Sequence, residues 1–262
     1  MRHKDPRTSS DRLMTWDDAF DFKCGQEIGC FNSCCRDVTI FLNPADIGRL
    51  RTALGISSTE FLNRYTVGLV AEQTGIPAVV LKMTDAAGKP CPFVTDQGCS
   101  VYEARPYSCR MYPLDTDDGI EYRFIVDGTT CLGLNESSPV TVEQWRQSQG
   151  LSFYDDIDHN LKDVMHAEAV WEGKIADTRM QDMIFTALYD PDRFREFIFE
   201  SSFLKKFVID EDILEKIRSD DVALLYFAGE WLRFSLFGKR TILKFDADYL
   251  KEKKKEVISG KR

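Results

Sequence analysis

The pattern of apolar and polar positions changes character about halfway along the chain. In the second half, apolar residues recur three and four positions apart, which is the period of an amphipathic helix. This spacing predicts several helices. Their expected ranges are about 153–171, 178–188 and 221–237, with others that begin near 190 and 210. Phenylalanines are frequent between 194 and 207, and we expect them to pack in the core of this helical region.

In the first half, short apolar runs predict strands at 37–42, 78–83 and 121–126. Asn43 followed by Pro44 predicts the start of a helix, because Asn caps a helix and Pro fits its first turn. Capping boxes at 57–60 and 141–144 predict two further helix starts. The stretch from 91 to 113 has no periodic pattern and is expected to be a loop.

The chain is acidic, with a formal net charge of -9. This charge argues against nucleic-acid binding, which depends on a basic surface. No apolar run reaches the length of about 20 residues that a membrane span needs. The charged first residues also lack the apolar stretch of an export signal. We therefore expect a cytoplasmic protein that binds neither nucleic acid nor membrane and keeps its thiols reduced.

Cysteine is concentrated in the first half of the chain. Four of the eight cysteines fall within residues 24–35, and none follows residue 131. In a reducing compartment such a set indicates metal binding or redox chemistry, whereas four disulfides would suit an exported protein. The candidate metal ligands are Cys24, Cys30, Cys34, Cys35, Cys91, Cys99, Cys109 and Cys131.

The chemistry of thiolates limits the metal. Thiolates select zinc, cuprous copper and iron–sulfur clusters over magnesium and calcium. We expect His3, His159 and His166 not to be ligands, so that sulfur holds the metal. The spacing lacks the paired knuckles of zinc fingers and the C-x3-C-x2-C run of radical-SAM sites. Eight thiolates fit two four-sulfur sites, or one cluster plus a second ion, and the irregular spacing favours [4Fe–4S] over Zn²⁺.

Arginines lie beside the cysteines. Arg36 follows Cys35, and Arg105 and Arg110 bracket Cys109. Guanidinium groups next to an anionic sulfur cage would lower thiolate pKa values and hydrogen-bond sulfur. Arg105 and Arg110 are therefore candidate cofactor-binding residues. The alternative for Arg105 is a surface ion pair with Glu103, which would contribute little.

These motifs resemble the YkgJ-type cysteine-cluster family, a zinc- or iron-chelating domain of the CxxCxxCC type. The resemblance rests on the knuckle at 24–36, on C-P-F-V at 91–94, on the run from Cys99 to Pro113 and on Cys131-Leu-Gly133. It covers about residues 20–135. The resemblance implies a metal role for all eight cysteines. Flagellin lysine methylase shares this type of domain, so the resemblance also admits a methylase.

Three functions follow as hypotheses. The first is a metal-binding protein that holds an iron–sulfur cluster or zinc through thiolates and is redox-active if it holds a cluster. The second is a protein-lysine N-methyltransferase, although no glycine-rich cofactor fingerprint is present. The third is a non-catalytic module in which structural zinc folds the first half and the helices bind an unknown protein partner. No nucleophile triad, P-loop or HExxH motif supports a hydrolase or NTPase.

Together the patterns predict an α+β fold, in which a small cysteine-rich metal-binding unit with few short strands precedes a mainly α-helical region. The expected divisions are an N-terminal tail at 1–19, a cysteine-cluster metal-binding domain at 20–135, an α-helical region at 136–250 and a charged C-terminal tail at 251–262.

Overall fold

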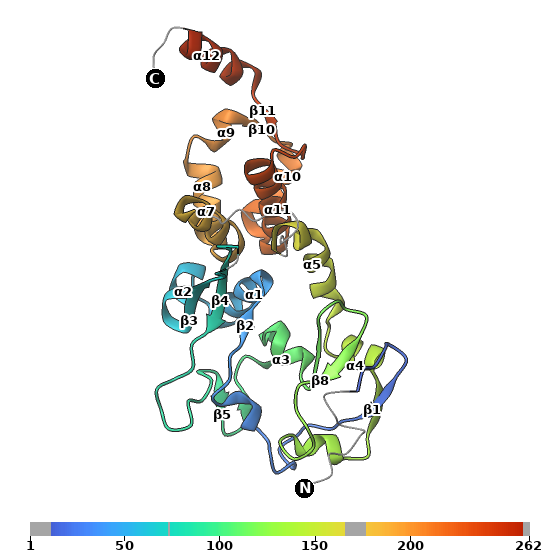
Figure 1. Ribbon diagram of the computed structural model, residues 1–262. Coiled ribbons are helices and arrows are strands. Elements are labelled where there is room, and N and C mark those ends of the chain that lie inside the picture. The colour runs from blue at the N-terminus through green and yellow to red at the C-terminus, as the bar shows by residue number, and fades with distance from the viewer. Residues whose placement is uncertain (1–11, 73, 166–176, 259–262) are drawn as a thin grey trace. The chain divides into compact units, whose positions relative to one another are not determined.

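The computed structural model describes residues 12–72, 74–165 and 177–258. Helices and several short strands confirm the α+β fold class (Figure 1). By their internal contacts, the described residues form two compact units. Unit 1 takes residues 12–54, 65–67 and 80–156, and unit 2 takes 55–64, 68–72, 74–79, 157–165 and 177–258. Both units are discontinuous along the chain, whereas the predicted domains are continuous segments whose boundaries stay a prediction.

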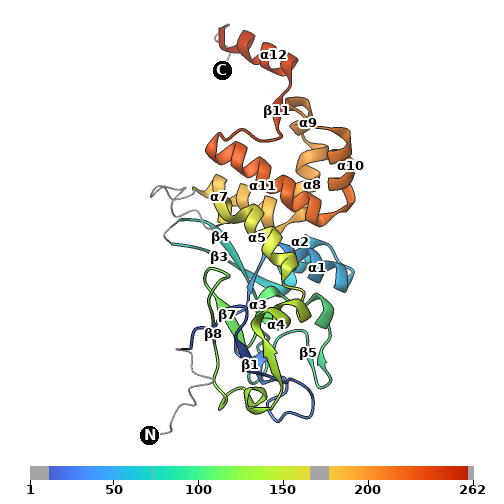
Figure 2. The same cartoon turned by 90° about the vertical axis from the view of Figure 1, so that its right-hand side faces the viewer.

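Unit 1 contains pairs of short antiparallel strands. The pairs are β1 (Ala19–Asp21) with β9 (Pro139–Thr141), β5 (Val94–Thr95) with β6 (Gly98–Cys99), and β7 (Leu114–Thr116) with β8 (Tyr122–Phe124). A further sheet has the order β2-β4-β3, from β2 (Phe41–Leu42), β4 (Pro77–Leu81) and β3 (Thr66–Val70). The first residues of β3 and the last of β4 belong to unit 1. Loops connect these short strands and account for much of unit 1 (Figure 2).

Short helices connect these strands. They are η1 (Ser33–Cys35), α1 (Pro44–Leu54), η2 (Tyr102–Ala104), α3 (Tyr107–Met111), η3 (Leu132–Asn135) and α4 (Val142–Ser148), and α5 (Ser152–Met165) also begins in unit 1. The capping box predicted at 141–144 is present, because Thr141 and Gln144 each bond the other's backbone N–H. Asn43 caps α1 as predicted, with its side chain accepting from the Ala45 N–H at 3.0 Å.

The core of unit 1 is aromatic and aliphatic. Phe20 packs edge-on against Phe124, with ring centroids 5.7 Å apart, and Trp145 packs edge-on against Phe20. Met14 bridges to Tyr122 by two backbone hydrogen bonds of 2.8 Å, and both side chains are buried. These contacts bring β1, β8 and α4 together.

Unit 2 is mainly helical. Its elements include α2 (Ser58–Tyr65, to residue 64), α7 (Thr178–Tyr189), α8 (Pro191–Glu200), α9 (Phe203–Lys206), β10 (Phe207–Val208), α10 (Glu211–Ser219), α11 (Asp221–Phe237), β11 (Lys244–Phe245) and α12 (Ala247–Ile258). α11 packs against α7 and α10, and α8 packs against α7 and α9. Asp177, Asp190 and Asp220 accept backbone N–H bonds at the starts of α7, α8 and α11, which explains why these helices begin where the sequence predicts.

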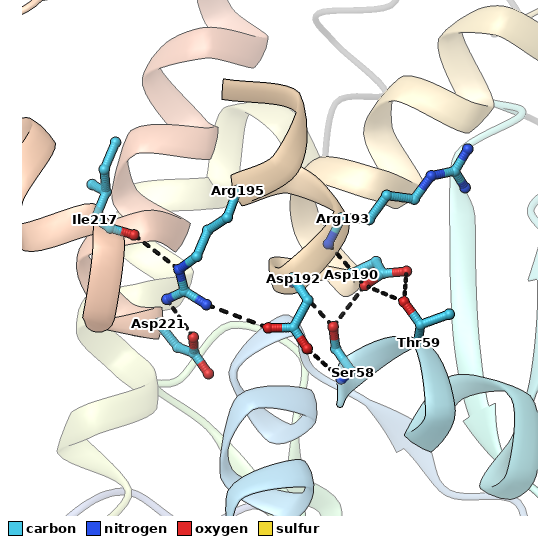
Figure 3. Close-up of polar contacts among 8 residues, drawn as sticks. All are labelled: Ser58, Thr59, Asp190, Asp192, Arg193, Arg195, Ile217 and Asp221. Atoms are coloured by element: carbon cyan, nitrogen blue, oxygen red, sulfur yellow. Dashed lines mark hydrogen bonds and ion pairs between the residues drawn. The ribbon is translucent and has the colours of Figure 1, made fainter. Parts of the chain in front are cut away.

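A polar network joins α2 to α8 within unit 2 (Figure 3). The buried Ser58 hydroxyl donates to Asp190 Oδ1 at 2.6 Å, and the Ser58 N–H donates to Asp192 Oδ2 at 2.8 Å. Arg195 extends the network by an ion pair of 2.6 Å with Asp221. Segment 55–64 is thereby fixed to helices that follow it by more than a hundred residues.

The phenylalanines between 194 and 207 are only partly in the core. Phe194 and Phe203 are buried as predicted, and both pack against Trp231. Phe197 is 37% exposed, so the prediction is wrong for this residue. The partly exposed ring of Phe197 stacks on the ring of the buried Phe194.

Two further predictions differ from the structure. The strand predicted at 37–42 is reduced to β2, and Asp37 adopts a positive φ of 48°, which interrupts extended backbone. The loop predicted at 91–113 contains β5, β6, η2 and α3, so it is wrong for those residues. Residues 166–171 of the predicted helix lie outside the described residues, whereas 221–237 matches α11 at both ends.

Within the part of the chain that the structure describes, no helix combines the length and apolar character needed to cross a membrane.

Candidate metal centre

Cys24 and Cys131 are brought together where strand β1 ends. Beyond the β1–β9 pair, the Lys23 N–H donates to the Gly133 carbonyl at 3.1 Å. A Cβ on Gly133 would lie 2.2 Å from the Lys23 carbonyl oxygen, so only glycine allows this approach. Cys24 follows Lys23 directly, and Cys131 precedes Gly133 by two residues. The close backbone contact therefore places both cysteines at the same end of unit 1.

Cys30 joins them through its sulfur. The Leu132 N–H donates to Cys30 Sγ at 3.2 Å, so this sulfur lies against the residue after Cys131. The chain then turns, with the Ser33 N–H bonded to the Cys30 carbonyl at 2.9 Å and Asn32 in the left-handed region at φ 66°. This turn leads into η1, which carries Cys34 and Cys35 next to each other.

A second backbone contact brings Cys35 beside Cys91. The Cys91 N–H donates to the Cys35 carbonyl at 2.8 Å, and Arg36 bridges Pro90 in antiparallel fashion. Cys99 follows through the β5–β6 hairpin, in which it pairs with Val94, and the Val94 N–H bonds the Cys91 carbonyl at 3.1 Å. Three cysteines from two separate segments are thus held by main-chain hydrogen bonds.

Cys109 lies on α3, whose start is held by a buried carboxylate. Asp46 Oδ1 accepts from the Tyr107 N–H at 3.0 Å and from the Tyr154 hydroxyl at 2.7 Å, while Asp46 Oδ2 accepts from the Asn43 N–H at 2.8 Å. Burial raises the pKa of Asp46 to about 6, although these three hydrogen bonds oppose the rise. Asp46 in turn contributes to the raised pKa of Cys109.

The thiols act on one another electrostatically. Burial raises the pKa of Cys24 to about 11, and the neighbouring Cys34, Cys131 and Cys30 add to the rise. Burial likewise raises the pKa of Cys109 to about 12. After burial, the largest cause of this rise is repulsion from the thiolate form of Cys91. Such thiols are neutral at pH 7 in the metal-free protein, and a metal would bind them by displacing their protons.

The adjacent pair differs from the other thiols. The Cys35 thiol donates a hydrogen bond to Cys34, which lowers the pKa of Cys34 and raises the pKa of Cys35. Cys34 is solvent-exposed, whereas Cys35 is half-buried. Cys34 is therefore the thiol of this pair that loses its proton more readily.

Tyr112 is a contact that sequence reasoning missed. Burial raises its pKa, and its hydroxyl donates a hydrogen bond to Cys131, which opposes the burial-driven rise in the pKa of that thiol. The signal was present in the run that ends Arg110-Met-Tyr112-Pro113, where the tyrosine lies between arginine and proline. Asp46 was also missed, because nothing local in its helix marks a long-range role.

The two predicted cofactor-binding arginines are buried. Arg105 donates to the Tyr102 carbonyl at 2.8 Å and to Gln149, and its guanidinium lies 3.8 Å from the centre of the Tyr102 ring. It opposes the burial-driven rise in the pKa of Cys99. Arg110 donates to the carbonyls of Arg105 and Gln149, at 2.9 and 2.8 Å. The role of both arginines in cofactor binding stays a prediction. Of the two, Arg105 is the one whose positive charge acts on the pKa of Cys99.

The donor set is suited to a thiophilic metal. All eight cysteines are free thiols, and all belong to unit 1. Among the residues that the structure describes, no three His, Cys, Asp or Glu side chains are arranged as ligands of one ion, and the eight ligands stay a prediction. His159 is exposed, and His3 and His166 lie outside the described residues. The donors available in unit 1 for zinc or iron are therefore mainly sulfur atoms.

Comparison with known proteins bears on the same segment. Residues 23–132 match the family model CxxCxxCC, whose description is "Putative zinc- or iron-chelating domain". A search of curated proteins and a search of solved structures each found no significant match. The match begins one residue before Cys24 and ends one residue after Cys131, so it includes every cysteine of the chain. Residues 23–132 are therefore similar to the CxxCxxCC family, which confirms the resemblance seen in the sequence.

Proposed function

We propose that unit 1 binds an iron–sulfur cluster or zinc through its cysteine thiolates. The observation that carries the proposal is that eight free thiols from separate segments all belong to unit 1 and all fall within the segment that matches a zinc- or iron-chelating domain. Their irregular spacing favours an iron–sulfur cluster. A bound cluster would supply a one-electron couple, whereas zinc would supply a redox-silent cross-link.

The chain's own residues would perform three tasks. The thiols would give up their protons and bind the metal, at a cost set by their raised pKa values. The Tyr112 hydroxyl and the Leu132 N–H would donate to the sulfurs of Cys131 and Cys30, which stabilises them as thiolates. Arg105 would offset part of the negative charge near Cys99.

The test is metal and acid-labile sulfide analysis of protein prepared without oxygen from cells supplied with iron and zinc. An iron–sulfur protein would contain iron and sulfide in about equal amounts and absorb broadly in the visible. Zinc without sulfide or colour would identify the structural alternative. A His159→Ala variant is the control, since this exposed histidine should leave the metal content unchanged. Protein without stoichiometric metal of either kind would refute the proposal.

A further inference from the structure

We propose that an acidic segment of a partner protein binds to the ribbon that strands β10 and β11 form in unit 2 (Figure 1). The surface that this segment would contact, the ribbon surface, consists of Lys205, Lys206, Val208, Arg240, Ile242 and Lys244. The ribbon surface contains no cysteine and lies outside the family match, so it is independent of the metal proposed for unit 1.

The ribbon has one covered face and one open face. Phe207 and Phe245 are partners in its antiparallel register, and their rings stack with centroids 5.0 Å apart. Phe234 of α11 packs edge-on against both rings, so this face of the ribbon lies on a helix of unit 2. Val208 and Lys244 are the neighbouring register pair, and their side chains therefore project from the opposite face. Within the part of the chain that the structure describes, the two strands pair only with each other.

The open face presents aliphatic side chains to water. Val208 is 54% exposed and Ile242 is 44% exposed. Leu243 is buried between the exposed Ile242 and Lys244, so this segment alternates and directs both of its exposed residues outward. Covering Val208 and Ile242 with an apolar surface would be favourable, because it removes their hydrocarbon from water.

Positive charge is concentrated around the same strands. Segments 205–208 and 239–256 carry nine Lys or Arg and four Asp or Glu, whereas the whole chain has a formal net charge of -9. Three of these lysines form ion pairs with carboxylates, namely Lys239, Lys251 and Lys253. Among the described residues, no carboxylate forms an ion pair with any of the four cations of the ribbon surface. Asp246, which follows β11, instead caps α12 by accepting from the Asp248 N–H at 2.9 Å.

These two properties together select the kind of partner. The unpaired cations favour an acidic ligand, and the exposed Val208 and Ile242 favour one that also carries apolar side chains. A bilayer or a nucleic acid is an extended polyanion and would be repelled by the remaining, acidic part of the chain, whereas a protein segment contacts the ribbon surface alone. A segment with Asp or Glu beside aliphatic or aromatic residues meets both requirements, because its apolar side chains supply affinity and its charges supply orientation and association rate.

A phage-displayed library of random peptides, selected on the full-length protein, tests the proposal. The most enriched peptide is synthesised with a fluorophore, and anisotropy measures its Kd for the unchanged protein and for double variants. R240E/K244E reverses two charges of the ribbon surface, and V208S/I242S removes its aliphatic side chains. K251E/K253E makes the same change of net charge on α12, outside the ribbon surface, and is the matched control. Circular dichroism confirms that each variant keeps the helical content of the unchanged protein.

The enriched peptides should contain Asp or Glu beside aliphatic or aromatic residues. R240E/K244E and V208S/I242S should each weaken binding of the synthetic peptide by about tenfold or more, whereas K251E/K253E should change it by less than about twofold. The proposal is wrong if no peptide is enriched, if the enriched peptides lack acidic residues, or if all variants bind the peptide equally.

Two further measurements examine other occupants of the ribbon surface. Vesicles that contain phosphatidylserine are mixed with the protein, and retention of the unchanged protein but not of R240E/K244E would overturn the proposal in favour of an anionic membrane. Sedimentation over a range of protein concentrations reports self-association. A dimer that V208S/I242S abolishes would overturn the proposal in favour of a second copy of this chain.

Discussion

The buried Asp46 carboxylate should make the stability of unit 1 depend on pH. It is fully buried and accepts hydrogen bonds from Tyr154, Tyr107 and Asn43. Burial nevertheless raises its pKa from 3.8 to about 6. The folded state therefore binds this proton more tightly than the unfolded state does.

The sign and size of the effect follow from linkage. A carboxyl group with a raised folded-state pKa contributes stability that is fully present below the unfolded value and is lost as pH rises through the folded value. For Asp46 this window lies between 3.8 and about 6. A shift of about two pKa units corresponds to about 3 kcal/mol, as an order of magnitude. Unit 1 should thus lose about that much of its free energy of unfolding between pH 3.8 and 7 through this residue.

The Asp46→Asn variant isolates the effect, because asparagine does not titrate. The assay is hydrogen exchange of the Tyr107 amide, which donates to Asp46 Oδ1. It is measured on metal-free protein from pH 4 to 7 and corrected for intrinsic exchange. The loss of an acceptor for the Asn43 N–H lowers the stability of the variant at every pH, so only the difference between the two proteins as a function of pH is diagnostic. A difference that stays constant from pH 4 to 7, or that grows in favour of the unchanged protein as pH rises, would refute the reasoning.

Three further predictions concern other parts of the chain. Gly133→Ala should weaken metal binding by about tenfold or more, because its Cβ would meet the Lys23 carbonyl at 2.2 Å. Gly68→Ala, whose Cβ would meet nothing within 4 Å, is the control in the same metal titration, and equal affinities would contradict the prediction. Asp190→Ala should destabilise unit 2 by about 2–3 kcal/mol, because it leaves the buried Ser58 hydroxyl without its acceptor and removes a helix cap. Chemical unfolding followed by helical circular dichroism measures this loss, and an unchanged midpoint would show that the network is dispensable. Zinc binding should release protons at pH 7, since burial holds several thiol pKa values above their usual range, and a weakly buffered titration with a pH indicator that detects no acid would contradict this.

The helical half could be predicted from sequence because its signals are local. Asp190-Pro191 and Asp220 predict helix starts that the structure confirms. The range of α11 also matches its prediction. The metal region could be recognised for a similar reason, since the cysteines and their neighbours form motifs within short stretches. These features need only the nearest residues in the chain.

Other features could not be predicted because they depend on contacts between distant segments. Nothing near Ser58 indicates that its acceptor is Asp190, so the assignment of 55–64 to the helical unit was not expected. Nothing near Asp46 likewise indicates that its carboxylate accepts a hydrogen bond from Tyr154, more than a hundred residues away. The helix α3 was missed because its five residues are too few to show a period. Sequence motifs name the candidate ligands, but the backbone contacts that group them come from the fold.

The discontinuity of unit 2 affects the order in which the chain matures during synthesis. Ser58 and Asp190 are separated by 132 residues. A ribosome adds about 5–20 residues per second, so α2 emerges on the order of ten seconds before its partner helix exists. The last cysteine, Cys131, is translated within that interval. All the thiol segments are thus synthesised before α8, the partner helix of α2, exists.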